Sequence, residues 1–203
     1  SIEPNLITRE ITDLVRSGKK IMPHFHIPLQ SGSDKILGLM RRRYRKKLFA
    51  EKTEMIRDLI PDAGIGTDVI VGFPGETTRE FGETFSFLKE IPLSYLHVFA
   101  FSERLGTPAV KMPGKVPSRD KEYRSRMLIS LSEEKNLEFR LKNIGKKTDV
   151  LFEDRRSGNM ITGLTPNYIR VEMPWKSSLA GKIARVELTG VSGDKNMTAL
   201  PVS

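Results

Sequence analysis

Cysteine is absent from this chain of 203 residues. Its absence excludes disulfide bonds, thiol nucleophiles and cysteine-ligated metal ions or iron-sulfur clusters from these residues. No stretch reaches roughly 18 consecutive apolar residues, the length that a transmembrane helix needs. The first residues, Ser1 to Pro4, are not a charged and then apolar leader. We therefore expect a cytoplasmic protein with no membrane association, whose sequence begins within a domain.

Two motifs of common enzyme classes are also missing. The chain has no Gly-x-x-x-x-Gly-Lys-Ser/Thr loop for nucleoside triphosphates and no Gly-x-Ser-x-Gly elbow of a hydrolase. With 38% hydrophobic and 29% charged residues, the composition is that of a globular protein. The net charge of +9 favours a polyanionic partner, because each neutralised phosphate releases condensed counterions.

Helix and strand patterns alternate over the first three quarters of the chain. Strands are predicted at 24–29, 65–71 and 95–101, and helices at 8–16, 34–43, 48–60 and 77–90. Thr77 and Glu80 match a Thr-x-x-Glu capping box for the last of these helices. Strands separated by such helices imply right-handed parallel crossovers, so we expect an α/β fold with a parallel sheet.

A loop at 102–117 precedes a long predicted helix that Ser118 caps and Gly145 stops. Its apolar stripe is expected at Tyr123, Met127, Leu128, Leu131, Leu137, Leu141 and Ile144. Short strands are then predicted at 149–153, 160–165, 168–173, 183–189 and 197–202, as in a small antiparallel β-barrel. We place a domain boundary near Lys146, between residues 1–145 and 146–203. Three parallel strands leave apolar edges, so we expect the carboxyl part of a larger barrel or self-association.

The segment Gly-Phe-Pro-Gly-Glu-Thr at 72–77 follows a buried strand and leads into a helix. Such a turn is expected to leave free backbone N–H groups at the carboxyl edge of the sheet, where α/β proteins bind ligands. Gln30 and Ser31 follow the first strand and should reach the same edge. Their amide and hydroxyl groups suit ribose hydroxyls or an amino-acid head group. We therefore expect a cofactor there, close to Gly72.

Asp68 interrupts the apolar strand, and an unpaired carboxylate there would cost several kcal/mol. It is expected to have an arginine or a ligand as its partner, as a structural ion pair or as part of a site. Arg42 can clamp a carboxylate through two parallel N–H bonds, although the cations around Tyr44 also fit a solvated helix end. Phe99 and Phe101 can flank an adenine or simply pack in the core.

His24 and His26 alternate along the first strand and therefore share one face. The sequence offers no third ligand nearby and no cysteine. We therefore expect hydrogen-bonded histidines close to a substrate rather than a metal site, and we assign no metal ligand and no catalytic residue.

In residues 146–203, basic side chains outnumber acidic ones by nine to six. Small barrels bind nucleic acid by combining a positive groove with aromatic platforms. The predicted RNA-binding residues are Lys146, Lys147, Arg155, Arg156, Tyr168, Arg170, Lys182 and Arg185. The alternative is a barrel that only packs on the first domain.

Four strings together resemble the radical S-adenosylmethionine methylthiotransferases. They are His-Ile-Pro-Leu-Gln-Ser-Gly-Ser at 26–33, Met-Arg-Arg-Arg-Tyr at 40–44, Asp-Val-Ile-Val-Gly-Phe-Pro-Gly-Glu-Thr at 68–77 and His-Val-Phe-Ala-Phe-Ser-Glu-Arg-Leu-Gly-Thr-Pro at 97–108. The second and fourth most resemble the branch that acts on threonylcarbamoyladenosine beside the anticodon of tRNA. Residues from Lys146 resemble the TRAM domain, a small OB-like RNA-binding β-barrel.

The resemblance implies the carboxyl half of a partial, TIM-like radical SAM barrel followed by a TRAM barrel. Full-length members bind two 4Fe-4S clusters through cysteines, none of which is present here. The resemblance therefore implies a fragment that is inactive alone, from an enzyme that adds a methylthio group to the modified adenosine. That enzyme would use S-adenosylmethionine as methyl donor and radical source, tRNA as partner, and a reductase or flavodoxin-like protein as electron donor.

The resemblance also suggests roles for single residues. Gln30 and Ser31 would approach the ribose or methionine end of S-adenosylmethionine, and Arg42 its carboxylate. Asp68 and Gly72 would line the same cavity, and the backbone from Phe99 to Phe101 would meet the adenine. The alternatives are a family member that modifies isopentenyladenosine in tRNA or a ribosomal protein, and a non-catalytic RNA-binding protein.

Overall fold

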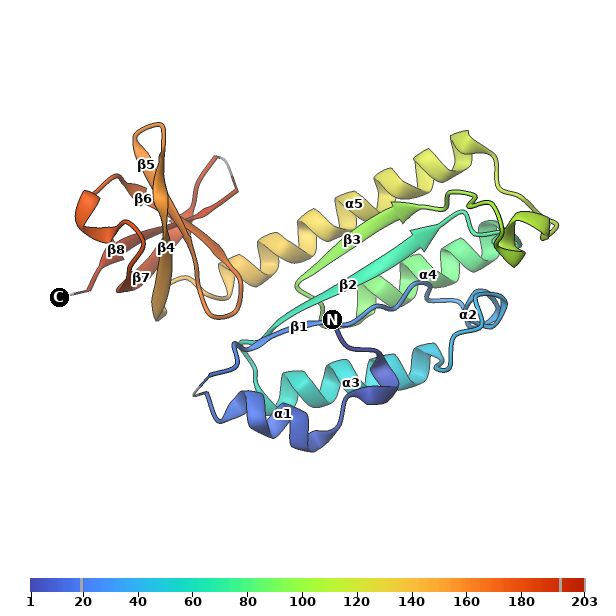
Figure 1. Ribbon diagram of the computed structural model, residues 1–203, viewed down its shortest axis with the longest axis horizontal. Coiled ribbons are helices and arrows are strands. Elements are labelled where there is room, and N and C mark those ends of the chain that lie inside the picture. The colour runs from blue at the N-terminus through green and yellow to red at the C-terminus, as the bar shows by residue number, and fades with distance from the viewer. Residues whose placement is uncertain (19, 194, 203) are drawn as a thin grey trace.

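The computed structural model describes residues 1–18, 20–193 and 195–202. It contains a three-stranded sheet in the order β1-β2-β3 and a closed barrel in the order β4-β5-β6-β8-β7 (Figure 1). In chain order the elements are η1 (Pro4–Leu6), α1 (Arg9–Arg16), β1 (His24–His26), α2 (Asp34–Leu39), α3 (Lys46–Leu59), β2 (Gly64–Val71), α4 (Thr78–Glu90), β3 (Tyr95–Ala100), η2 (Pro108–Lys111), α5 (Ser118–Leu141), β4 (Lys147–Ser157), β5 (Met160–Leu164), β6 (Arg170–Pro174), η3 (Ser177–Leu179), β7 (Ile183–Val191) and β8 (Met197–Pro201).

The three strands of the sheet are parallel, as the alternation of helices and strands predicts. β1 is shorter than predicted because a side chain interrupts the ladder: the Thr67 hydroxyl accepts a hydrogen bond from the Leu29 N–H (3.0 Å) and donates to the carbonyl oxygen of Ile27 (2.6 Å). Pairing resumes beyond it, where the Gln30 N–H donates to the carbonyl oxygen of Asp68 at 2.8 Å. The carboxyl ends of the three strands therefore meet at one edge of the sheet.

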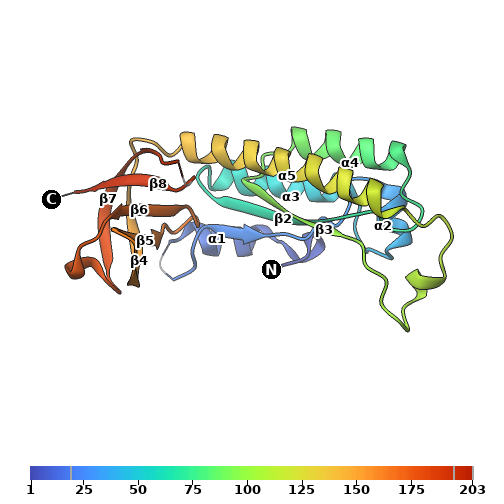
Figure 2. The same cartoon turned by 90° about the horizontal axis from the view of Figure 1, so that it is seen from above.

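The two faces of this sheet differ in chemistry. Helices α3, α4 and α5 lie over one face (Figure 2), where Ile27, Ile65 and Val69 are fully buried. Within the described residues, no helix covers the other face. Alternation along each strand brings the polar side chains of His26 and Asp68 to this face, together with the apolar side chain of Ile70.

The long helix α5 packs through only part of the predicted stripe, of which Leu128 and Leu131 are buried. Three members of the predicted stripe are about half exposed: Tyr123 (57%), Leu137 (46%) and Leu141 (51%). The buried residues of α5 are Arg124, Leu128, Leu131 and Lys135. Lys135 Nζ donates hydrogen bonds to the carbonyl oxygens of Lys89 (3.0 Å) and Ile91 (2.8 Å), where α4 ends. Because both ends of the buried stripe are cations, hydrophobicity revealed only its middle.

The barrel has its own hydrophobic core, which includes Val150, Phe152, Ile161 and Val171. The prediction of an all-antiparallel barrel is wrong at one position, because β6 and β8 pair in parallel. The remaining neighbours are antiparallel. No helix among the described residues combines the length and the apolar character needed to cross a membrane.

The barrel lies against the amino-terminal ends of the parallel strands, opposite the carboxyl edge (Figure 1). Asn167 Nδ2 donates to the carbonyl oxygen of Asp62 at 2.9 Å, and Lys146 forms an ion pair with the Asp62 carboxylate. A Cβ at Gly64 would lie 2.4 Å from the carbonyl oxygen of Asn167. The contact is therefore close enough to require glycine at this position.

The predicted capping box of α4 is confirmed. Thr77 Oγ1 accepts a hydrogen bond from Arg79 N (3.2 Å), and Glu80 Oε2 accepts one from Thr77 N (3.0 Å). Lys35 Nζ donates to the other carboxylate oxygen of Glu80 at 2.9 Å. Hydrogen bonds from Thr77 and then Lys35 lower the pKa of Glu80 to about 2.

We expect Thr77→Ala to lower the free energy of unfolding by about 0.5–2 kcal/mol near neutral pH. The folded-state pKa of Glu80 lies below its ordinary value of 4.5, so its stabilisation is complete above that pH and is lost as the pH falls toward 2. The difference between wild type and variant should therefore shrink on acidification, as urea unfolding would measure. The neighbouring exposed Thr78→Ala is the control. A difference that stays constant down to about pH 2.5 would contradict this assignment.

Candidate functional site

Three amides of the glycine-rich loop after β2 already have partners, so the prediction of free amides is wrong for Gly72, Gly75 and Glu76. The N–H of Gly72 donates to Glu76 Oε1 at 2.8 Å. The N–H of Gly75 donates to the carbonyl oxygen of Gly114 (2.9 Å), and that of Glu76 to the carbonyl oxygen of Phe73 (2.9 Å). These amides stabilise the loop itself and are not available to an anion.

A buried ion pair fixes this loop to α5. Arg124 Nη1 lies 2.6 Å from Glu76 Oε1 and 3.1 Å from the Glu76 carbonyl oxygen. The two side chains are 8% and 1% exposed. Burial raises the pKa of Glu76, and the hydrogen bonds from Gly72 and Arg124 oppose that rise. The guanidinium also lies 5.5 Å from the ring centroid of Phe81.

Arg124→Ala should lower the free energy of unfolding by about 3–5 kcal/mol, because it leaves the buried carboxylate of Glu76 without its counter-charge. Arg126→Ala is a matched control on the same helix, since Arg126 is 67% exposed in its i,i+4 pair with Glu122. The control should cost less than about 1 kcal/mol. Urea denaturation of both variants would measure the difference, and equal losses would refute the proposed importance of the pair.

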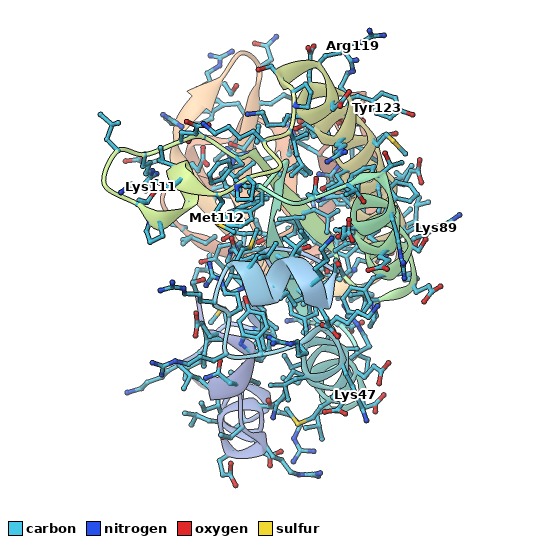
Figure 3. The ribbon with its side chains drawn as sticks, turned by 90° about the vertical axis from the view of Figure 1, so that its right-hand side faces the viewer. Lys47, Lys89, Lys111, Met112, Arg119 and Tyr123 are labelled. Atoms are coloured by element: carbon cyan, nitrogen blue, oxygen red, sulfur yellow. The ribbon has the colours of Figure 1, made fainter. Side chains whose placement is uncertain are left out.

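A cavity of about 520 Å³ lies at the carboxyl edge of the sheet, a volume typical of small-molecule sites. Its lining residues come from α2 and the turn after it, the ends of β2 and β3, and the segment around η2: Gly38, Leu39, Met40, Arg41, Arg42, Ile70, Phe73, Phe101, Thr107, Pro108, Ala109 and Met112. Figure 3 looks onto this end of the molecule, with α2 in the middle and the segment carrying Lys111 and Met112 to one side.

Two of the predicted cofactor residues line this cavity. Arg42 Nη1 donates to Glu3 Oε1 at 3.2 Å, and Phe101 packs edge to face against Phe73 with ring centroids 5.1 Å apart. Gln30 and Phe99 do not line it. The Gln30 side chain belongs to a buried residue with a positive φ of 70°, whereas Phe99 is 51% exposed.

Two further predicted residues have structural partners. Ser31 is fully buried, and its hydroxyl lies 3.2 Å from Thr84 Oγ1 on α4, away from the cavity. Gly72 has a φ of +76°, and a Cβ there would lie 2.2 Å from Cγ of Lys121. Lys121 Nζ continues past it to the carbonyl oxygen of Phe101 at 3.2 Å. The glycine is thus required by packing.

Asp68 has two histidines as partners, and the expected arginine is not among them. His26 Nε2 lies 2.9 Å from Asp68 Oδ1, and His97 Nδ1 lies 3.4 Å from the same oxygen. His26 and Asp68 were each predicted from the sequence as separate candidates, and His97 was not predicted. The available signal was its position in the third strand, because His97 is directly paired with Asp68 in the parallel register.

A second polar group lies nearer the barrel. His24 Nε2 and the Tyr95 hydroxyl are 2.8 Å apart, and the Tyr168 ring stacks on His24 with centroids 4.0 Å apart. Burial, together with the nearby charge of His26, lowers the pKa of His24 to about 4, and burial raises the pKa of Tyr95 to about 12. Both groups are therefore neutral at pH 7. One face of Tyr168 already has a partner within the chain.

Most of the predicted RNA-binding cations have polar partners on the protein. Arg155 and Arg170 pair with Glu153, and Arg185 with Asp149. Lys146 pairs with Asp62, and Arg156 Nη2 donates to Asn159 Oδ1 at 2.5 Å. In the described part of the chain, Lys147 and Lys182 form no ion pair.

An apolar groove lies beside these cations. Its volume is about 380 Å³, and its lining residues are Met22, Asp149, Leu151, Leu164, Thr165, Pro166, Tyr168 and Ile183. Tyr168 remains 55% exposed, and Ile183 is 69% exposed. Arg185 flanks the groove, because it is paired with Asp149 across β4 and β7. Tyr168, the predicted aromatic platform, therefore lies in the same groove as the Asp149 that pairs with Arg185.

Comparison with known proteins agrees with this architecture. Residues 1–88 match the Radical SAM superfamily. Over 192 residues the chain is 38% identical to threonylcarbamoyladenosine tRNA methylthiotransferase MtaB of Bacillus subtilis, covering 93% of this chain and 43% of that protein. Over 191 residues it is 40% identical to tRNA-2-methylthio-N(6)-dimethylallyladenosine synthase of Symbiobacterium thermophilum, covering 92% of this chain and 40% of that protein.

Among solved structures, coproporphyrinogen III oxidase (HemN) of Escherichia coli, a radical SAM enzyme, superposes with a TM-score of 0.56 at 11% identity. The superposition covers 93% of this chain and 45% of that one, and it supports the fold alone. The chain spans about two fifths of the length of the curated relatives that it matches.

Proposed function

The chain belongs to the radical SAM methylthiotransferases, and on that premise we propose that it is part of an enzyme that adds a methylthio group to N6-threonylcarbamoyladenosine in tRNA. The observation that carries the proposal is the parallel sheet whose carboxyl edge opens onto a cavity of about 520 Å³. Parallel α/β folds bind ligands at that edge. An enzyme that acts on tRNA would work in the cytoplasm.

S-adenosylmethionine fits the cavity at the carboxyl edge. Arg42 would hold its carboxylate in place of Glu3, and Phe73 with Phe101 would offer apolar surface to the adenine. Gln30 and Phe99 do not line this cavity, so we leave them out of the proposed cofactor site. When bound, S-adenosylmethionine supplies a transferable methyl group and the radical chemistry. We leave Asp68 out of this site, because its carboxylate already has His26 and His97 as close partners.

A 4Fe-4S cluster does not fit the residues present, because such clusters are held by thiolates and this chain has no cysteine. We therefore assign the ligands of both family clusters to polypeptide outside this sequence. Without a cluster of its own, the 203-residue chain would be inactive by itself. The role of the chain in the enzyme is to hold the cofactor and to bind tRNA.

Residues 146–203 are assigned to a TRAM-like domain that binds tRNA. Single-stranded nucleic acid is bound by cations that follow the backbone and by aromatic rings that stack on bases. The groove beside Tyr168, with Lys147, Lys182 and Arg185 nearby, combines these features. The barrel and the carboxyl edge lie at opposite ends of the sheet (Figure 1). The uncovered face of the sheet therefore lies between the proposed tRNA site and the proposed cofactor site.

Mass spectrometry of tRNA nucleosides from cells that lack the gene would test the proposed reaction. We expect the 2-methylthio mark on threonylcarbamoyladenosine to disappear and the unmodified threonylcarbamoyladenosine to accumulate. Restoring the gene is the control. Loss of the mark on dimethylallyladenosine would instead support the second candidate function, which the relative from Symbiobacterium thermophilum favours. A tRNA pool with both marks intact would reject the two together.

The double variant Lys147→Ala, Lys182→Ala should weaken tRNA binding by this chain and make it less salt-dependent. Each lost phosphate contact reduces the slope of log affinity against log salt by about 0.7 to 0.9, so two should reduce it by about 1.4 to 1.8. Fluorescence anisotropy over a range of salt concentrations would measure this. Lys89→Ala, an exposed cation at the end of α4, is the control. An unchanged slope in the double variant would argue that the barrel only packs on the sheet.

A further inference from the structure

We propose that His26, Asp68 and His97 bind one divalent transition-metal ion. The three residues come from β1, β2 and β3, so no local sequence motif contains them. The site is separate from the cavity assigned to S-adenosylmethionine, whose lining includes none of the three. It also uses no cysteine, so it is distinct in chemistry from any iron-sulfur cluster.

The register of the sheet brings the three side chains together. Asp68 is paired directly with His97, and His26 is paired with Gly66, two residues before Asp68. Side chains two residues apart on a strand share a face, so His26 extends across the position of Gly66 toward Asp68. Glycine is needed there, because a Cβ at Gly66 would lie 2.1 Å from Cζ of Tyr95.

The potential ligand atoms already converge. His26 Nε2 lies 2.9 Å and His97 Nδ1 3.4 Å from Asp68 Oδ1. All three atoms lie within 4.8 Å of one another. A tetrahedral ion with bonds of about 2.0–2.1 Å holds its ligand atoms about 3.3 Å apart. Small side-chain rotations, with no change in the strands, are therefore enough to surround an ion.

The donor set indicates which ion would bind. Two imidazole nitrogens and one carboxylate oxygen suit Zn²⁺, Co²⁺ or Fe²⁺, whereas Mg²⁺ and Ca²⁺ prefer oxygen ligands alone. Three protein ligands leave a coordination position open. That position lies toward the uncovered face, where the His97 side chain is 54% exposed and those of His26 and Asp68 are 19% and 25% exposed. An oxygen or nitrogen atom of a ligand could enter there.

Neighbouring groups restrict the orientation of the two ligand rings. The Tyr95 ring centroid lies 6.4 Å from that of His26 and 5.1 Å from that of His97. The chain has three histidines, and the third, His24, is directed elsewhere. Its Nε2 lies 2.8 Å from the Tyr95 hydroxyl, and its ring stacks on Tyr168. His24 therefore provides a matched control within the same strand.

Titration of the chain, prepared without a polyhistidine tag, tests the site. Co²⁺ binding would be followed by visible absorption, and Zn²⁺ binding by calorimetry and by displacement of Co²⁺. We expect one equivalent of either ion. Loss of an outer-shell partner typically weakens metal binding about 10- to 100-fold, so loss of a ligand in His97→Ala or Asp68→Asn should weaken it more than about 100-fold. His24→Gln should bind within about twofold of wild type.

His97→Ala is expected to fold, because its side chain is half exposed, and circular dichroism would verify this. Asp68→Asn keeps the shape of the side chain and provides a second variant if His97→Ala is unstable. Absence of saturable binding of both ions would overturn the proposal. Equal affinity of wild type and the two ligand variants would do so as well. The outcome is independent of the proposed modification of tRNA, which is read from nucleosides.

Discussion

The buried pair between Glu76 and Arg124 is the interaction on which the arrangement of this chain depends. It joins the loop after β2 to α5, and the Glu76 carboxylate also accepts a hydrogen bond from the N–H of Gly72. A charge taken out of water is tolerated only when its hydrogen bonds and counter-charge are supplied by the fold. At its other end α5 is fixed by Lys135, which donates to the carbonyl groups that end α4. The helix is thus fixed to its neighbours near both of its ends.

Because α5 leads directly into the barrel, these two attachments also set where the barrel lies. It packs against the amino-terminal ends of the strands through Asn167 and Tyr168. The cavity is at the carboxyl ends (Figure 1). The uncovered face of the sheet runs between them and carries the polar group of His26, Asp68 and His97. In the proposed function, a nucleotide bound near the barrel would meet the cofactor along this face.

The sequence was informative about elements and poor about partners. The parallel strands, the capping box of α4 and the stop of the long helix before Gly145 were predicted correctly, because each depends on residues close in sequence. The amides of the glycine-rich loop and the partner of Asp68 were predicted wrongly, and the buried stripe of α5 was predicted only in part. Each of these depends on a side chain from a distant element: Glu76 with Arg124, His97, and the carbonyl groups bonded by Lys135.

The sequence by itself determined that the chain has a parallel α/β part followed by short strands, that it offers no thiolate, and that its motifs are those of one enzyme family. These properties follow from periodicity, composition and local order along the chain. Only the tertiary structure decided which polar groups face each other across the sheet. Strand register sets those distances, and register is fixed by packing of the buried face, which brings together residues that are far apart in the sequence.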